Sequence, residues 1–276
     1  MNSVAIICAR EILLGIRNRW VLATTLLLAA LSLSLALLGS APTGQVGVGA
    51  LDVVIVSLTS LSIFLVPLIA LLIAHDAIVG EAERGTLPLL LSYPVRRWQV
   101  IVGKFCGHVL ILLFATIIGY GAAALALALT GAELLQQSVM AFAIMVGSSV
   151  LLGAVFVALG YLISTLAPDR GTAAGASIGV WLLLVLIFDS ALLGILVIDQ
   201  GKTITAGILN ILLLLNPTDV YRLFNLTRSA NVGQFAGMTG LAQSAVWSQS
   251  ILLAVLLLWT IFPLALATIA FKRKQV

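Results

Sequence analysis

Charged residues are scarce in this chain of 276 residues: Asp, Glu, Lys and Arg together make up 9% of it, whereas hydrophobic residues make up 62%. A soluble domain carries about 25% charged residues, because its surface must stay in contact with water. This shortage excludes a water-soluble globular protein. Strict alternation of polar and apolar residues is also absent, which argues against a transmembrane β-barrel. The composition therefore predicts an all-α integral membrane protein.

Groups that perform catalysis or bind metals are also few. The chain has two cysteines and two histidines, and Cys106 and His108 are two positions apart on a predicted helix, which points them to different faces. Met140 and Met145 are five positions apart, a spacing that does not place them at one site. No His-Glu-x-x-His sequence, acid pair or Ser-His arrangement is visible. We therefore predict no metal site and no catalytic residue, and we expect Cys8 and Cys106 to remain ordinary thiols.

Long apolar stretches dominate the sequence instead. A helix that crosses a bilayer needs about 20 apolar residues, and six stretches reach this length. They are Trp20 to Gly39, Val53 to Ala74, Phe105 to Thr130, Ser138 to Leu166, Thr172 to Ile198 and Ser248 to Phe271. The sequence therefore predicts six transmembrane helices.

The basic residues indicate how these helices are oriented. Cytoplasmic segments of membrane proteins are rich in Lys and Arg. If both termini are cytoplasmic, eleven of the 14 basic residues fall on the cytoplasmic side, and only Lys202, Arg222 and Arg228 fall outside. We therefore predict cytoplasmic N and C termini. The net charge of +4 is spread beside apolar segments instead of forming one basic face, which argues against nucleic-acid binding.

Two segments outside the spans are expected to lie at the membrane surface. In residues 1–19, apolar residues recur at helical spacing among arginines, which indicates an amphipathic helix on the cytoplasmic surface or a charged flank that only fixes orientation. Thr203 to Leu215 is apolar but too short to span, and Asn216-Pro217 ends it. We predict an external interfacial or re-entrant helix there, within an extracytoplasmic region that covers residues 199–247.

The connection between the second and third spans, residues 75–104, mixes charged with apolar residues. The four leucines between positions 87 and 91 lie near water in the predicted topology, so this segment is expected to form a surface for a cytoplasmic partner. Gly85 and Pro88 are expected to break the backbone around a short helix. Gly103-Lys104 lacks the other residues of a P-loop, so no ATP site is predicted. A purely structural interfacial loop is the alternative.

Two further polar groups are candidates for contacts with partners. Asp169 and Arg170 lie in the short connection between the fourth and fifth spans, which is either a second cytoplasmic contact or a plain turn. On the external side, Thr218 or Asp219 is placed to cap a short helix. The same region is alternatively a docking surface for a periplasmic partner. The residues of that surface would be Asn216, Pro217, Asp219, Tyr221 and Arg222.

The fifth span carries two unusual features. Asp189 is the one carboxylate deep in a predicted span, where a charge is costly. It is therefore a candidate for an ion path, unless the span ends near Phe188 and leaves Asp189 at the interface. Gly171, Gly175 and Gly179 recur every four residues and predict a face for close helix packing, either within the bundle or between two copies.

The connection of residues 75–104 also carries a family pattern. Its sequences Glu81-x-Glu83-Arg84-Gly85-Thr86-Leu87, Leu90-Leu91-Ser92-Tyr93-Pro94-Val95-Arg96-Arg97 and Gly103-Lys104 resemble the cytoplasmic segment of ABC-2 type permeases. The resemblance implies two copies per complex and a coupling helix that docks on a separate ATPase, which would bind ATP and Mg²⁺, while this chain would bind no cofactor. The docking residues that it implies are Glu81, Glu83, Arg84, Gly85, Thr86, Leu87, Leu90, Leu91 and Tyr93.

A closer resemblance rests on the overall sequence and on Leu215-Asn216-Pro217-Thr218-Asp219-Val220-Tyr221-Arg222. This pattern is similar to the permease of the assembly machinery for nitrous oxide reductase in denitrifying bacteria. It implies a multi-pass protein of the bacterial inner membrane, a NosF-like cytoplasmic ATPase, a NosD-like periplasmic β-helical partner, and a role in assembling the copper-sulfur centre of the reductase. We therefore expect a permease subunit that couples ATP hydrolysis to transport or to force on a periplasmic partner. The alternative is an ATPase-independent membrane scaffold or channel for a periplasmic assembly factor.

Overall fold

The computed structural model describes residues 3–39, 50–129, 136–199, 205–226 and 247–274. All elements in these ranges are helical, and no strand is present among them. The elements are α1 (Ser3–Ile16), α2 (Arg19–Gly39), α3 (Ala50–Ala74), α4 (Val79–Glu83), α5 (Thr86–Leu91), α6 (Arg97–Leu129), α7 (Gln136–Leu166), α8 (Arg170–Leu182), the π-helical turn η1 (Leu183–Ile187), α9 (Phe188–Asp199), α10 (Ala206–Leu214), α11 (Pro217–Leu226) and α13 (Gln249–Arg273).

Six helical segments in the described ranges are long and apolar enough to cross a membrane, which confirms the six predicted spans. They are α2, α3, α6, α7, the continuous unit α8-η1-α9, and α13. The third span begins at Arg97, not near Phe105, so Gly103 and Lys104 lie on a helix and not in a connection. This earlier start follows the turn at Pro94, after which the Arg96 N–H donates to Gln99 Oε1 at 2.8 Å.

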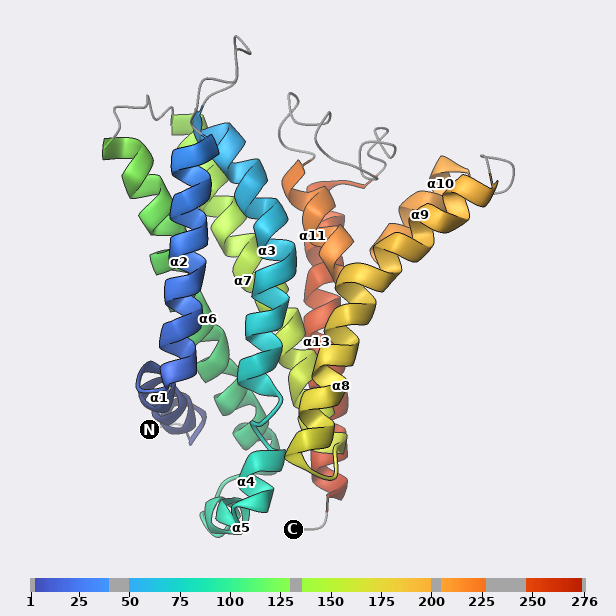
Figure 1. The fold of residues 1–276 in the computed structure, drawn as a ribbon. Helices are drawn as coiled ribbons and strands as arrows, with labels where there is room; N and C mark the ends of the chain where they lie inside the picture. Colours follow the sequence, from blue (N-terminus) through green and yellow to red (C-terminus); the bar gives the residue numbers. More distant parts are fainter. Residues whose placement is uncertain (1–2, 40–49, 130–135, 200–204, 227–246, 275–276) are drawn as a thin grey trace.

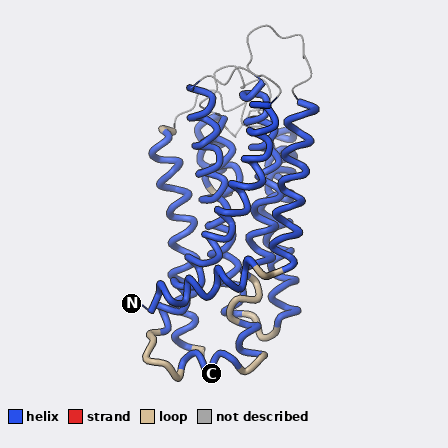
Figure 2. Tube along the Cα trace, turned by 90° about the vertical axis from the view of Figure 1, so that its left-hand side faces the viewer, coloured by secondary structure: helices blue, strands red, loops and turns tan. Residues whose placement is uncertain are grey.

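Helix α1 and the last turn of α13 lie at the same end of the bundle, which we call the terminal end, and the opposite end is called the distal end (Figure 1). Helix α1 runs across the terminal end and packs on α6 (Figure 2). Glycines allow this close approach, because a Cβ atom at Gly107 would lie 2.6 Å from the Cβ of Glu11. The buried face of α1 therefore rests on α6, and its other face exposes apolar residues such as Leu13.

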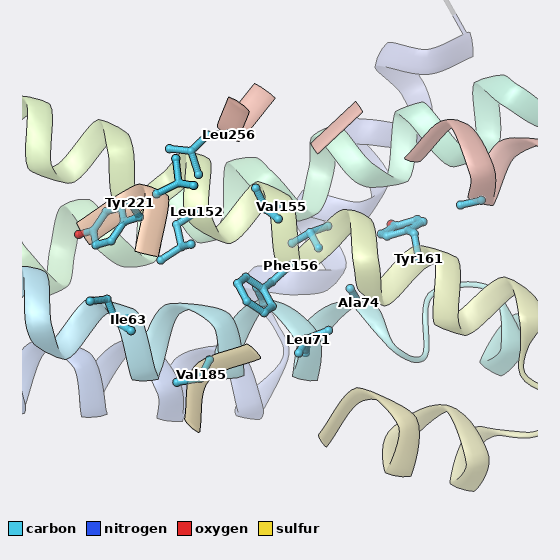
Figure 3. Packing of buried hydrophobic residues seen from close by; sticks show 14 of the residues in the cluster. Ile63, Leu71, Ala74, Leu152, Val155, Phe156, Tyr161, Val185, Tyr221 and Leu256 are labelled. Carbon is cyan, nitrogen blue, oxygen red and sulfur yellow. The ribbon is translucent and has the colours of Figure 1, made fainter. Parts of the chain in front are cut away.

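Helix α7 forms the centre of the bundle and packs against α3, α6 and α13. The core between these helices contains large side chains with no exposed surface, among them Phe156, Leu152 and Tyr161 (Figure 3). Small residues bring α7 and α3 close together, since a Cβ at Gly160 would lie 2.6 Å from the Cβ of Ala74. In apolar surroundings such close packing, and not the exclusion of water, holds helices together.

The fifth span leaves this bundle. The unit α8-η1-α9 tilts away from the other spans toward the distal end (Figure 1), and most of its apolar side chains are exposed, such as Val197 and Ile198. Nothing lies within 4 Å of the positions that Cβ atoms at Gly175 and Gly179 would occupy. The predicted small-residue face is therefore not used for packing within the described part of the chain.

The apolar segment after the fifth span folds as predicted into a short helix, α10, at the distal end (Figure 1). The chain reverses at Asn216, and α11 then packs against α7, α3 and α13. The cap of α11 differs from the predicted one. Asn216 Oδ1 accepts from the Thr218 N–H at 3.1 Å, and Pro217 takes the first helical position.

We predict that Gly160→Leu destabilises the fold, because the new side chain must separate α7 from α3. The expected cost is about 1–3 kcal/mol in the free energy of unfolding, the usual range for overpacking. Gly147→Leu on the same helix is the matched control, since nothing lies within 4 Å of a Cβ there. Thermal unfolding in detergent measures both variants, and equal midpoints would contradict the close contact of α3 with α7.

Candidate functional site

The segment between α3 and α6, residues 75–96, lies at the terminal end and is called the α3-α6 connection below. Helix α4 is separated from α5 by Gly85, whose φ of 68° is in the left-handed region that glycine adopts without strain. Pro88, which was predicted to break the backbone, lies within the first turn of α5, where its missing N–H leaves no helical bond unmade. The connection is therefore two short helices joined by a glycine turn.

Helix α4 receives its N-terminal cap from another helix. No side chain of its own caps it. Instead Ser164 Oγ of α7 accepts from the backbone N–H groups of Ile78, at 3.0 Å, and Val79, at 3.1 Å. Both donors belong to buried residues, so without Ser164 they would lack partners. This contact of Ser164 was not predictable from the sequence, because a serine in an apolar helix usually bonds to its own backbone.

A buried ammonium group holds the connection on the bundle. Lys104 of α6 is 2% exposed, and its Nζ lies 2.7 Å from Glu11 Oε1 of α1 and 3.0 Å from Glu81 Oε1 of α4. A lysine charge in apolar surroundings is very costly unless it is paired. One cation therefore joins three helices that are far apart in the sequence.

Polar groups extend this cluster toward α7 and toward the surface. Glu11 Oε2 lies 3.7 Å from His108 Nε2, and His108 Nδ1 is 2.8 Å from the Tyr161 hydroxyl of α7. Arg10, which is half exposed, has Nη1 3.8 Å from Glu81 Oε1. Glu81 Oε2 is buried and has no hydrogen-bond partner among the described residues. Two carboxylates thus share one buried ammonium, and Arg10 supplies a second positive charge at the rim.

The two predicted cytoplasmic contact elements are joined to each other. Asp169 caps α8 by accepting from the Thr172 N–H and hydroxyl, both at 2.8 Å, and these bonds lower the pKa of Asp169. The Arg170 guanidinium forks onto the carboxylate of Asp76, and the Arg170 N–H donates to Glu83 Oε1 at 2.8 Å. The turn before α8 and the α3-α6 connection therefore form one unit.

The predicted docking residues divide into a buried and an exposed group. Glu81 and Leu87 are buried, so the prediction that they contact a partner is corrected: Glu81 pairs with Lys104, and Leu87, 0% exposed, belongs to the core. Leu90 and Leu91 are half buried. The exposed predicted residues are Glu83, Arg84, Gly85, Thr86 and Tyr93. Leu89, which the family pattern did not single out, is also exposed, at 66%.

A second buried polar cluster lies between α9 and α11. Arg222 Nη2 is 2.8 Å from Asp189 Oδ2, and Nη1 is 2.9 Å from Asp219 Oδ1. Asn216 Nδ2 donates to Asp219 Oδ2 at 3.1 Å. Burial raises the pKa of Asp219, and the charge of Arg222 opposes this. Asp189, the candidate for an ion path, is therefore one member of an ion-paired cluster that joins the fifth span to α11.

This cluster corrects the prediction of a periplasmic contact surface. Its predicted residues lie inside the chain, where Asn216, Asp219 and Tyr221 are fully buried and Arg222 is largely buried. Asn216 Nδ2 also donates to the Leu184 carbonyl, in the π-helical turn of the fifth span, at 2.8 Å. The residues corrected in this way are Asn216, Pro217, Asp219, Tyr221 and Arg222.

The comparisons with known proteins agree with this architecture. Residues 5–276 match the model of the ABC-2 family transporter proteins. The chain belongs to this family. It is 48% identical over 277 residues, covering all of both chains, to the probable ABC transporter permease protein NosY of Pseudomonas aeruginosa. It is 47% identical over 276 residues, covering 99% of both chains, to the protein of the same name in Stutzerimonas stutzeri.

Membership of this family decides the class of the protein. It is an ABC transporter permease subunit that crosses the inner membrane several times, and it belongs to a permease family rather than a catalytic one. The expected resemblance to a permease of the NosY type is confirmed by these two relatives.

We predict that Lys104→Met costs about 3–5 kcal/mol in the free energy of unfolding, because it removes the buried ammonium that the Glu11 and Glu81 carboxylates share. The triple variant Lys104→Met, Glu11→Gln, Glu81→Gln should recover most of this loss, since no charge then remains buried. Lys272→Met, at an exposed position of the same end, is the control. Denaturation in detergent measures all three, and a Lys104→Met protein as stable as wild type would refute the ionic joint.

Proposed function

We propose that this permease couples ATP hydrolysis by a separate cytoplasmic ATPase to a rearrangement on the periplasmic side. The terminal end is then the cytoplasmic end, in accord with the excess of Lys and Arg in the segments that lie there. ATP and Mg²⁺ would bind to the partner, and this chain would supply no cofactor site.

The exposed face of the α3-α6 connection is the observation that carries this proposal. Leu89 and Tyr93 are 66% and 68% exposed at an end where the chain meets water. The connection that bears them is fixed through α4 to α1 and α6 by Lys104, to α7 by Ser164 and to α8 by Arg170. A partner that pushes on this face would therefore act on four helices of the bundle at once. A loop that only joins two spans would not need these attachments.

The residues of this face indicate which partner surface would be complementary to it. Leu89 and Tyr93 are apolar anchors, and the side chain of Arg84 in the same connection is 54% exposed, with Nη2 3.9 Å from Asp76 Oδ2. Arg96 is also exposed, whereas Glu83 is engaged with the backbone of Arg170. An apolar groove with acidic residues at its rim is complementary to this arrangement.

The pairing of the charged groups among the spans favours transmission of force over transport of ions. The ionisable groups that the structure places among the spans are paired with one another: Lys104 with two glutamates, and Arg222 with two aspartates. Such closed pairs do not form a path for ions. By its resemblance to the nitrous oxide reductase system, the chain would act with a periplasmic β-helical partner in assembling the copper site of that enzyme.

We also propose that two copies of the chain form the permease, with the fifth span at their interface. This span is the least buried of the six, and its faces at Gly175 and Gly179 are open. Glycines four residues apart allow helices from two chains to approach closely.

We predict that Gly175→Leu combined with Gly179→Leu abolishes this dimer. The leucines hold the two backbones apart, while the single chain has free space for both side chains. Gly147→Leu, at another open glycine, should leave the dimer intact. The mass of the particles in detergent or nanodiscs distinguishes one copy from two. A dimer that survives the double substitution would show that the interface does not lie at Gly175 and Gly179.

The docking proposal predicts that Leu89→Asp weakens binding of the cognate ATPase by about tenfold or more, because a charge replaces an apolar anchor. Arg273→Gln is the matched control: it changes the net charge by the same amount at another exposed position of the terminal end. Co-purification and ATP hydrolysis measure both variants. Unchanged binding by Leu89→Asp would refute docking at this face. If the wild-type chain binds no ATPase, the alternative function as an ATPase-independent scaffold or channel is favoured.

A further inference from the structure

We propose that α7 is the rod that carries displacements of the α3-α6 connection to α11 at the distal end, with Ser164 as its positioning residue. This inference rests on the proposed coupling to an ATPase. It goes further, because it names the element that moves and the contacts that make it move.

The terminal end of α7 is bonded directly to the start of α4. Ser164 Oγ is fully buried and accepts two backbone N–H groups where α4 begins. Backbone groups of this kind cannot change partners easily in a buried site, since no water is present to replace the bond. A displacement of α4 therefore pulls or pushes α7 at a fixed point.

The middle of α7 is bonded to α11 by two neighbouring serines. Ser149 Oγ lies 2.8 Å from the Tyr221 hydroxyl, and Ser148 Oγ donates to Asn225 Oδ1 at 3.1 Å. All four residues are buried. Helix α11 in turn contacts the fifth span through Asn216 and Arg222. A displacement of α7 is therefore passed to α11 and from there to the span that is least attached to the bundle.

Between Ser149 and Ser164 α7 has no interruption. Both residues belong to one α-helix without proline or π-helical turn, and at 1.5 Å per residue they are about 22 Å apart along its axis. In contrast, α3 contains Pro67, the fifth span contains η1, and α13 contains Pro263. Helices bend at such points, so displacements are absorbed there.

Helix α6 is equally continuous, but its polar contacts lead elsewhere. It meets the connection through Lys104, and at its distal half Tyr120 bonds to Ser62 of α3, at 2.5 Å. Two of the described spans, α7 and the fifth span, bond directly both to the α3-α6 connection and to α11. Of these two, α7 has no π-helical turn between its bonded points.

The test places a reporter next to α11 in the assembled permease and ATPase complex. Leu215, which is 56% exposed and precedes the cap residue Asn216, is changed to Cys and labelled with an environment-sensitive fluorophore, in a chain with Cys8→Ser and Cys106→Ser. ATP and Mg²⁺ are added to the complex in nanodiscs. Fluorescence, ATP hydrolysis and retention of the ATPase are measured on the same sample.

The decisive comparison is between two neighbouring hydroxyl groups of α7. Ser164→Ala removes the bonds to α4, whereas Thr165→Val removes a hydroxyl that bonds only to the Tyr161 carbonyl of its own helix. We expect Ser164→Ala to keep the ATPase and to hydrolyse ATP within about twofold of wild type, while its reporter signal falls about fivefold or more. Thr165→Val should respond as wild type does. A full response in Ser164→Ala overturns the inference.

A second variant acts where α7 is bonded to α11. Tyr221→Phe removes the bond to Ser149 without changing the ring, so the reporter should lose its response in the same way. If Ser164→Ala does not fold, this variant decides, and a full response in it overturns the inference. A wild-type complex that hydrolyses ATP with a silent reporter also overturns it but leaves docking intact. A wild type that binds no ATPase instead refutes the proposed function.

Discussion

Every backbone polar group that is freed in apolar surroundings must find a partner within the chain, and the arrangement of this permease follows from that requirement. Helices begin and end where their unpaired N–H and C=O groups can be satisfied. Ser164 supplies the acceptor for the start of α4, and Asn216 supplies a donor to the Leu184 carbonyl in the π-helical turn. The end of α13 is held by Arg97, which donates to the carbonyls of Phe271 and Lys274, both at 2.8 Å.

The same rule governs the charges. Lys104 and Arg222 each bridge two carboxylates: the Lys104 cluster joins α1, α4 and α6, and the Arg222 cluster joins α9 to α11. A buried pair of this kind adds little to stability compared with apolar residues, but it is very costly to break. It therefore fixes which helices meet and in which register. The connection at the terminal end and α11 at the distal end are both positioned in this way.

The sequence predicts the spans well because a membrane helix is a local property. Length and hydropathy decide it, and all six predicted spans are present among the described residues. The short helix α10 was predictable for the same reason, since its apolar run ends at Asn216-Pro217. Boundaries near charged residues were less predictable: Lys104 was assigned to a connection because a lysine is costly in a helix that crosses the membrane, unless partners from elsewhere neutralise it.

The site was predictable in position but not in the direction of its side chains. Glu81 and Glu83 are two residues apart on a helix of five residues, and one is buried while the other is exposed. Which one turns inward depends on Lys104 and Glu11, which no local pattern connects to them. In the same way, the polar residues after Asn216 suggested a surface. They are buried because their partners, the Leu184 carbonyl and Asp189, lie on another helix.

The attachments of the fifth span would allow this loosely packed helix to respond to the proposed partner at the other end of the molecule. Its terminal end is held to the α3-α6 connection by Arg170 with Asp76, its middle to α3 by the bond from Trp181 Nε1 to the Phe64 carbonyl at 3.1 Å, and its distal half to α11 by Asp189. Two of these three points lie on the elements that α7 joins. Since few apolar contacts hold the span in place, its position is set mainly by those polar contacts. A span attached in this way follows the connection and α11 when they move, and the face that it would present to a second copy moves with it.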